Sequence, residues 1–515
     1  MKARVLQAQL ARHWPWLLIG LGILLRTVQY LSGRSLWGDE GALALNIVNR
    51  SYGALLQPLD HKQVAPVLFL WASRAAVDLL GPGEDALRLP AFVCGVLSVP
   101  LFYLLARRWS DTSSAAIATA LFAISEHLVA YSDELKQYST DVFFALLIFW
   151  LSGAGQPRLQ RWWLVGLVGM VAVWASHASA LMLAGVCLVQ GIATLQERRW
   201  RDLAAVIGCG VMWASSFVVM YFMTLTSATR SSYLMDYWQG TFAPIPPKSP
   251  GDLRWFVDTP FKLLAMPGGF PYPGVAALPL LVGILATYRA SPHKCWLTLS
   301  GVLVALLASS VGKYPFGGRL MLFAVPFGLL FIGEGAALMV RDARSLKGGV
   351  GPLLMLLLFV PTGIIAARDL IHPRTKEEVR PVVQEMLAQW RAGEPIYVYY
   401  GARYPFRYYA DRMGLQPDQY TIGGEFRKDW ERYRDDLKAL LGEPRAWIVF
   451  AHPCTWEGVD EEVLFRRYLD QLGRKRAEFA RPGATVFLYD FTRPGKGAPE
   501  DSGPDPPATS AKSDR

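Results

Sequence analysis

Two adjacent carboxylates, Asp39 and Glu40, are the residues of this sequence whose type and spacing most directly suggest chemistry. They follow the first long apolar run, Trp14 to Leu31, and come shortly after an aromatic residue, Trp37. A charged group is costly to hold close to lipid, so an acid pair at the end of an apolar run usually has a function. Such a pair could supply a general base. The structural alternative is a helix start, because two acids suit the first turn of a following helix.

Other ionisable or hydrogen-bonding groups lie in the turns that we expect on the same side of a membrane. They are Lys62, Asp133, Glu134, Lys136, Tyr138, His177, Lys313 and Arg319. Acids in two turns and cations in two others could give a base for an acceptor hydroxyl and counter-charges for a phosphate leaving group. We therefore predict that Asp39, Asp133 or Glu134, His177 and Arg319 converge on one outward cavity.

Each of these residues also has a plainer interpretation. His177 could cap a helix, and Lys313 and Arg319 could be interfacial cations whose stems lie along apolar surface. Lys136 could form an ordinary local ion pair with the preceding acids. The acids together with His61 or His177 could hold a divalent metal, although the chemistry above requires none. The five Cys show no CxxC or metal spacing.

The composition is that of a polytopic membrane protein. Of 515 residues, 52% are hydrophobic and 18% are charged. The apolar residues fall in runs of about 15–22, which is the length needed to cross a hydrocarbon core of roughly 30 Å. The net charge of +10 does not indicate nucleic-acid binding, because Lys and Arg cluster in short loops as membrane topology requires. We predict about eleven spanning helices: residues 14–32, 87–106, 113–131, 139–153, 162–176, 178–195, 203–225, 274–289, 295–311, 319–340 and 349–367.

The charged, apolar segment 64–80 decides the topology. If it lies along the membrane surface, the basic loops all share a side with the N-terminus, as the positive-inside rule favours. The N-terminus is then cytoplasmic, and the acid pair and the C-terminus lie outside the inner (plasma) membrane. Residues 33–86 become a first outward loop with interfacial helices, and 226–273 a second. These loops complete a module that we expect to cover 1–371.

After residue 371 the composition turns polar. Three runs are typical of strands, namely 396–400, 446–450 and 485–489, and helical patterns lie at 404–413, 429–441 and 460–473. Alternating strands and helices predict a small α/β domain over residues 372–493, on the outer side. Residues 494–515, rich in Pro, Gly, Ser and Asp, are expected to form a disordered tail.

An ordered series of short motifs in the N-terminal part resembles the GT-C membrane glycosyltransferases. The series comprises Leu36 to Glu40, Ala65-Pro66 opening an apolar helix, Leu80-Gly81, Leu87 to Ala91, and Gly95. More narrowly, it is similar to family 39 and to the related aminoarabinose and protein O-mannosyl transferases. The segment from Tyr131 to Tyr138 resembles that group's second loop, where an acid precedes an aromatic residue. The likeness covers residues 14–200, and a further short resemblance lies at 313–326.

The resemblance implies a GT-C fold and a polyprenyl-phosphate-linked sugar as donor. It makes Asp39 the general base and gives Glu40 a role in orienting acceptor or donor. Lys62 lies close to where relatives have a polar cluster, and Asp133 and Glu134 compete for the second-loop acid. A single displacement with one base would invert the anomeric centre. The expected partners are the donor, an envelope lipid or glycan acceptor, and membrane lipids.

Three other functions remain open from the sequence. A protein O-glycosyltransferase would share the donor chemistry and differ in the acceptor. A lipid or sugar transporter or flippase should have its polar residues in mid-membrane on broken helices with repeated halves, and we find no repeat. In a non-catalytic assembly subunit Asp39 would be dispensable.

Overall fold

The computed structural model describes residues 2–153, 159–226, 232–342, 350–427, 429–453, 455–456 and 459–493. The expected tail at 494–515 lies outside these residues. Contacts group the chain into two compact units. The helical unit comprises Met1–Gly33 and Asn46–Arg374, and the α/β unit comprises Arg34–Leu45 and Thr375–Arg515. The segment with the acid pair therefore groups with the C-terminal residues, although the sequence suggested that it belongs with the helices. Each unit is described by itself.

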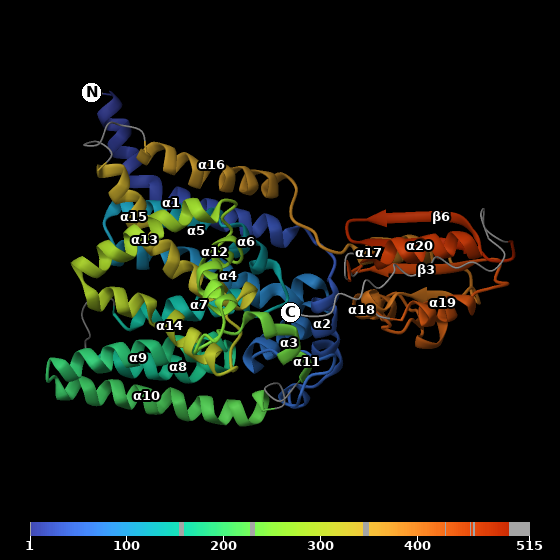
Figure 1. The fold of residues 1–515 in the computed structure, drawn as a ribbon, viewed down its shortest axis with the longest axis horizontal. Coiled ribbons are helices and arrows are strands. Elements are labelled where there is room, and N and C mark those ends of the chain that lie inside the picture. Colours follow the sequence, from blue (N-terminus) through green and yellow to red (C-terminus); the bar gives the residue numbers. More distant parts are fainter. Residues whose placement is uncertain are drawn as a thin grey trace. The chain divides into compact units, whose positions relative to one another are not determined.

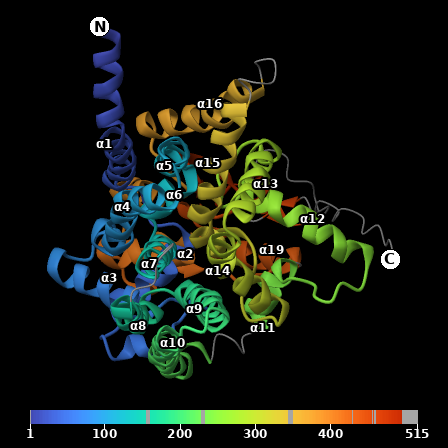
Figure 2. The ribbon, with the colours of Figure 1, turned by 90° about the vertical axis from the view of Figure 1, so that its left-hand side faces the viewer.

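The helical unit is a bundle of long helices that run beside one another (Figures 1 and 2). Its α-helices are α1 (Lys2–Leu31), α3 (Val67–Leu80), α4 (Glu84–Trp109), α5 (Thr112–Ile124), α6 (Glu126–Ala130), α7 (Tyr138–Leu151), α8 (Leu159–Ala175), α9 (Ala178–Gln196), α10 (Trp200–Met220), α11 (Ser232–Trp238), α12 (Pro250–Ala265), α13 (Pro273–Ala290), α14 (Pro292–Ser310), α15 (Val325–Asp342) and α16 (Val350–Ile371). Short turns of helix are η1 (Ala54–Leu56), η2 (Tyr131–Asp133), η3 (Tyr221–Leu225), η5 (Gln239–Thr241) and η6 (Gly318–Ala324). Helix α2 (Gly38–Asn49) begins in the α/β unit.

All eleven predicted spans coincide with apolar helices. Among the described residues, eight helices are long and apolar enough to cross a membrane. The bent pair 112–124 and 126–133, with an angle of 52° between its parts, could form a ninth span. The helices Tyr138–Leu151 and Arg161–Ala175 are apolar but shorter. The number of crossings and their orientation stay predictions.

The charges that made segment 64–80 ambiguous have a structural role in α3. Arg74 donates to the carbonyl oxygens of Ile47 and Val48, at 3.0 and 2.9 Å, and so satisfies the open carbonyl end of α2. It also pairs with Asp78 one turn later, at 2.9 Å. Helix α3, at 67–80, lies in the first predicted outward loop, and α12, at 250–265, lies in the second. Their position at a membrane surface stays a prediction.

The α/β unit is a five-stranded sheet in the order β2-β1-β3-β7-β6. Strands β1, β2 and β3 are parallel, and β7 and β6 run antiparallel. Register is continuous from β2 to β7, with Tyr397 beside both Thr421 and Ile448, and Ile448 beside Phe487. The pairing of β6 with β7 shifts register between Lys475 and Ala477. The elements are α17 (Val379–Gln389), β1 (Ile396–Val398), η7 (Tyr400–Ala402), α18 (Arg403–Arg412), η8 (Pro417–Gln419), β2 (Thr421–Ile422), α19 (Trp430–Lys438), β3 (Ala446–Ala451), β4 (Thr455–Trp456), β5 (Val459–Asp460), α20 (Glu461–Leu472), β6 (Arg474–Arg481) and β7 (Ala484–Asp490).

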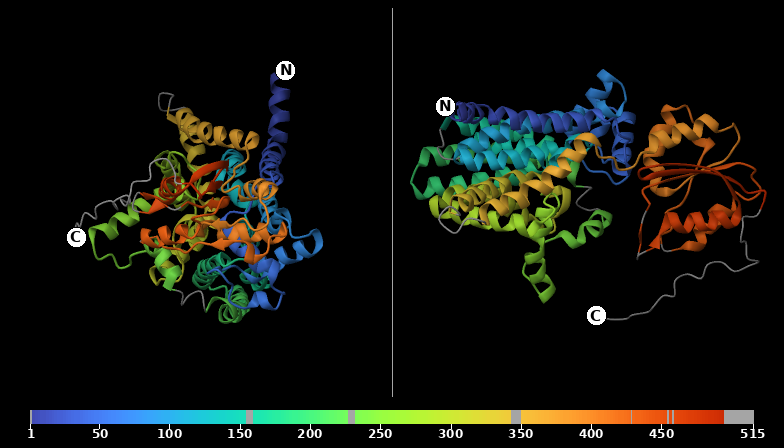
Figure 3. Two further views of the ribbon diagram at one scale, coloured as in Figure 1. Left: turned by 90° about the vertical axis from the view of Figure 1, so that its right-hand side faces the viewer. Right: turned by 90° about the horizontal axis from the view of Figure 1, so that it is seen from above.

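Helices cover both faces of this sheet, with α17 and α18 on one side and α19 and α20 on the other (Figure 3). Strands β1, β3 and β7 are accordingly buried along their whole length, which explains their uninterrupted apolar sequences. The predicted α/β fold and its three apolar strands are confirmed. Sequence analysis missed α17 and β6. Strand β6 is a largely exposed edge strand rich in Arg, so it lacks the apolar pattern by which the others were recognised.

Candidate active site

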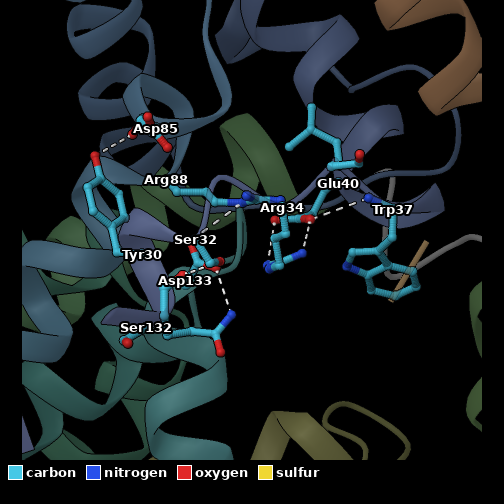
Figure 4. Close-up of polar contacts among 12 residues, drawn as sticks. Tyr30, Ser32, Arg34, Trp37, Glu40, Asp85, Arg88, Ser132 and Asp133 are labelled. Carbon is cyan, nitrogen blue, oxygen red and sulfur yellow. Dashed lines mark hydrogen bonds and ion pairs between the residues drawn. The ribbon is translucent and has the colours of Figure 1, made fainter. Parts of the chain in front are cut away.

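Glu40 holds the segment that carries the acid pair. Its carboxylate receives two hydrogen bonds from Arg34, at 2.8 and 3.3 Å, and both side chains are buried (Figure 4). It also accepts the backbone N–H of Trp37, at 3.4 Å, which is one half of a capping box at the start of α2. This paired carboxylate suits a structural role better than the substrate-orienting role predicted for it. Asp39, by contrast, is only half-buried.

Side chains bind every backbone N–H from Ser35 to Gly38. Glu378 accepts the N–H of Ser35 at 3.3 Å, and the Tyr409 hydroxyl accepts that of Leu36 at 2.7 Å. Glu40 accepts the N–H of Trp37, and Glu377 accepts the N–H of Gly38 at 2.9 Å. Three of these four acceptors come from the residues after 374. The backbone leading to Asp39 is therefore fixed by side chains distant in sequence.

His452 completes this arrangement at the carboxyl end of β3. Its Nδ1 lies 2.6 Å from the Oε1 of Glu377, whose other oxygen holds Gly38. The Glu377 carboxylate, and to a lesser extent Asp39, raises the pKa of His452 above its ordinary value. His452 has a φ of 55°, a left-handed conformation that costs energy outside glycine. The imidazole of this residue is thus held beside Glu377, which supports the segment leading to the predicted base.

The second-loop acid of the helical unit is buried and charge-paired. Asp133 accepts from the amide of Gln29 at 3.2 Å, and its carboxylate lies 3.9 Å from the guanidinium of Arg88 (Figure 4). Arg88 and Asp133 are almost completely buried. Glu134 is also buried. Both competing acids are therefore buried, and Asp133 is paired with Arg88.

Two predicted cations meet at the segment 131–138: Lys136 lies within it, and Arg319 packs on it. Lys136 donates to the side-chain oxygen of Gln63 at 2.6 Å. Arg319, from η6, lies over the ring of Tyr138 with its central carbon 5.7 Å from the centroid. The rings of Tyr138 and Tyr131 lie edge to face, 5.2 Å apart, and Arg319 and Glu134 both act electrostatically on the Tyr131 hydroxyl. Residues 131–138 thus gather cations and acids in a cluster that we call the Tyr138 cluster: Tyr131, Glu134, Lys136, Tyr138 and Arg319.

The other predicted residues are less clearly connected to this cluster. His177 lies in the turn between α8 and α9, and among the described residues its Nε2 has no hydrogen-bond partner. Burial lowers the pKa of His177 to about 4, so the imidazole is neutral at neutral pH. Lys313 and Lys62 are exposed. Asp39 belongs to the α/β unit, so its convergence with Asp133 and Arg319 stays a prediction.

Seven residues of these arrangements were not found from the sequence: Gln29, Arg34, Arg88, Glu377, Glu378, Tyr409 and His452. Arg88 gave a usable signal, because a charge inside an apolar run is expensive and therefore usually paired or functional. Glu377 and Glu378 gave none, because acids are common in polar segments. The position of His452 directly after a strand is typical of functional residues at the carboxyl edge of α/β sheets.

The described part of the chain offers no fitting set of ligands for the suggested divalent metal. No group of three or more His, Cys, Asp or Glu side chains there could hold a metal ion. We therefore derive no step through a metal.

Comparisons with known proteins agree with one another. Residues 64–221 match the family model described as dolichyl-phosphate-mannose-protein mannosyltransferase. An undecaprenyl phosphate-alpha-4-amino-4-deoxy-L-arabinose arabinosyl transferase of Pseudomonas paraeruginosa is 26% identical over 325 residues, which are 61% of this chain and 57% of that protein. Its counterpart in Pseudomonas aeruginosa is 30% identical over 186 residues, covering 34% of this chain and 32% of the relative. This chain therefore spans 57% of the length of the first relative and 32% of the length of the second.

Solved structures extend the likeness to most of the chain. ArnT from Cupriavidus metallidurans bound to undecaprenyl phosphate gives a TM-score of 0.54 at 13% identity, covering 92% of this chain and 98% of that one. The apo form of that protein gives 0.52 at 14% identity, covering 93% and 98%. At this level of identity the likeness concerns the fold.

Proposed function

We propose that this chain, which has a GT-C fold related to aminoarabinose transferases and protein O-mannosyltransferases, is a membrane glycosyltransferase. Its donor is a sugar linked to a polyprenyl phosphate, and its acceptor is an envelope lipid or glycan. The protein spans the inner membrane many times, with the N-terminus in the cytoplasm and the α/β unit outside. Transfer takes place at the outer face.

Asp39 acts as the general base in this proposal. It removes the proton of the acceptor hydroxyl as the oxygen attacks the anomeric carbon. The bond from that carbon to the lipid phosphate breaks, and the phosphate leaves with the bonding electrons. Lys136 and Arg319 stabilise the charge that develops on the phosphate. A single displacement of this kind inverts the anomeric centre.

The Tyr138 cluster is the observation that carries the proposal. Lys136 lies within the aromatic segment 131–138 and donates to Gln63, and Arg319, from a segment distant in sequence, lies over Tyr138 beside buried acids. A transporter does not need cations and acids gathered in one cluster. A departing lipid phosphate, by contrast, requires cations beside it. The half-buried Asp39 offers a carboxylate that is less sequestered than Glu40 or Asp133.

Envelope composition tests the proposal. We expect a deletion strain to lose one glycosylated lipid or glycan, and wild-type protein but not Asp39→Asn to restore it, as measured by mass spectrometry. Equal membrane levels of both proteins provide the control. An unchanged profile in the deletion strain would remove the support for an enzyme, and restoration by Asp39→Asn would exclude that residue as the base.

Protein O-glycosylation is the second candidate, because the family model that matches residues 64–221 is described as acting on protein. The same mass spectrometry separates the two candidates. For protein O-glycosylation, the deletion strain would lose the sugar from its proteins, and its lipids would be unchanged.

A further inference from the structure

The proposed function gives no role to the residues after 374 in the α/β unit. We propose that Glu377 is a positioning residue that fixes the base-bearing segment, with His452 as its partner. The inference rests on the proposed function, because Glu377 can affect sugar transfer in this way only if Asp39 is the base. Glu377 itself touches no reacting atom in this scheme.

The first argument is the location of the hydrogen bond. Glu377 accepts the N–H of Gly38, the residue immediately before Asp39, at 2.9 Å. This N–H is one of the open donors at the start of α2, where a negative charge is also favoured by the helix dipole. Losing the carboxylate would free the Trp37–Gly38 peptide bond, one residue before the base. A displacement of about 1 Å at a reacting group can cost on the order of 10²-fold in rate.

The second argument is that the segment has little other freedom. Gly41 packs directly against the backbone of α18, since a Cβ at this position would lie 2.6 Å from the nitrogen of Pro405. Glu378 also accepts the hydroxyl of Ser35 at 3.0 Å, in addition to its N–H. The segment is therefore fixed on both sides of Asp39. Glu377 supports the residue directly before the base.

The third argument is that the partner of Glu377 can change its charge. His452 is bonded to Glu377, its ring lies 6.2 Å from that of Trp37, and Asp39 and Arg427 also act on it electrostatically. Lys376 adds a fixed positive charge over Trp37, with its nitrogen 4.0 Å from the ring centroid. Protonated His452 pairs with Glu377 and orients it toward Gly38. Neutral His452 can keep only a weaker hydrogen bond.

Two variants of Glu377 test the inference. Glu377→Ala removes the acceptor, and we expect amide exchange in residues 34–45 to accelerate roughly tenfold or more, as for loss of a hydrogen bond to a charged group. Transfer in cells should fall on the order of 10²-fold. Glu377→Gln keeps an acceptor for Gly38, so exchange should stay slow. Its transfer should lose the pH dependence that the charged pair confers.

Glu385 on α17 supplies the matched control. It is an exposed carboxylate of the same unit whose Oε1 accepts only from Gln389, at 3.2 Å, among the described contacts, and Glu385→Ala should change neither exchange nor transfer. Unchanged exchange at 34–45 in Glu377→Ala would overturn the inference, as would faster exchange with full transfer. Binding of undecaprenyl phosphate, used as a probe, should stay within about twofold, because Lys136 and Arg319 are intact. A large loss of binding would also contradict a positioning role.

The exchange measurement separates failure of this inference from failure of the proposed function. If Asp39→Asn transfers at the wild-type rate, the proposed base is wrong, whatever the behaviour of Glu377→Ala. If Asp39→Asn is inactive and Glu377→Ala leaves both exchange and transfer unchanged, the base stands and the positioning role falls.

Discussion

The two units hold Asp133 and Asp39, the acids predicted to act in the reaction, in opposite ways. In the helical unit, Asp133 is buried and its own charge is matched by Arg88 and Gln29. In the α/β unit, the contacts are made to the backbone before Asp39, and the carboxylate itself is half-buried. A charge that is matched and buried serves as a fixed part of a site. A base must keep its carboxylate accessible, so its position has to be secured through neighbouring atoms.

Breaking the charge pairs should give the largest effects on stability. Arg34→Met leaves the buried carboxylate of Glu40 without its bidentate partner, which should cost about 3–5 kcal/mol. We expect a lower thermal midpoint in detergent and faster exchange at 34–45. The double variant Arg34→Met/Glu40→Leu should recover most of this loss, because an apolar pair of similar volume avoids burying a lone charge. If the single variant is as stable as the wild type, the pair does not hold the segment.

Arg88→Met is the corresponding change in the helical unit. It removes the cation nearest to buried Asp133, and the pair is longer than Arg34–Glu40, at 3.9 against 2.8 Å. We expect a smaller loss of about 2–4 kcal/mol, since the amide of Gln29 still donates to Asp133. Exchange should accelerate around residues 131–138 and stay unchanged at 34–45. Faster exchange at 34–45 instead would contradict the separate support of the two acids.

Two close-packed glycines give a matched comparison of the backbones. A Cβ at Gly41 would overlap with the backbone of Pro405, and one at Gly95 with the side chain of Ser132, next to Asp133. Each change to Ala should cost about 1–3 kcal/mol, because the Cβ of Ser132, at 2.4 Å, is fixed to its backbone and can yield as little as the backbone of Pro405, at 2.6 Å. Gly53→Ala is the control, since nothing lies within 4 Å of that position. Equal thermal midpoints for all three variants would show that neither contact is tight.

The smallest expected effect is a dependence on pH that is confined to the α/β unit. The pKa of His452 is raised in the folded chain by Glu377, so its stabilising contribution is complete below about pH 6.5 and is lost as the pH rises through the folded value. Exchange at 34–45 should therefore accelerate as the medium becomes more alkaline, after correction for the intrinsic rate. His452→Asn should abolish this acceleration. If the variant keeps it, another group is responsible.

The sequence predicted the parts of this molecule that depend on hydrophobic pattern. The predicted spans coincide with apolar helices, and the apolar strands 446–450 and 485–489 lie within β3 and β7. The predicted resemblance to GT-C glycosyltransferases is confirmed by the matching family model, the curated relatives and the fold of ArnT. These features are local or follow from order along the chain.

Pairings between distant residues could not be predicted in the same way. Glu377 and Gly38 are joined only by the fold, and nothing in either local sequence indicates the other. Glu40 was expected to orient a substrate, whereas its partner Arg34 was overlooked although it lies only six residues away. The resemblance pointed to the acid pair as a unit, and only the contacts distinguish its two members.

Turnover by purified Asp39→Asn tests the central claim most directly. The reaction would be followed as release of undecaprenyl phosphate from an undecaprenyl-phosphate-linked sugar in the presence of membrane lipid acceptors. We predict a rate about 10²–10⁴-fold below that of the wild type, with an unchanged thermal midpoint. Wild-type turnover by the folded variant would contradict the account.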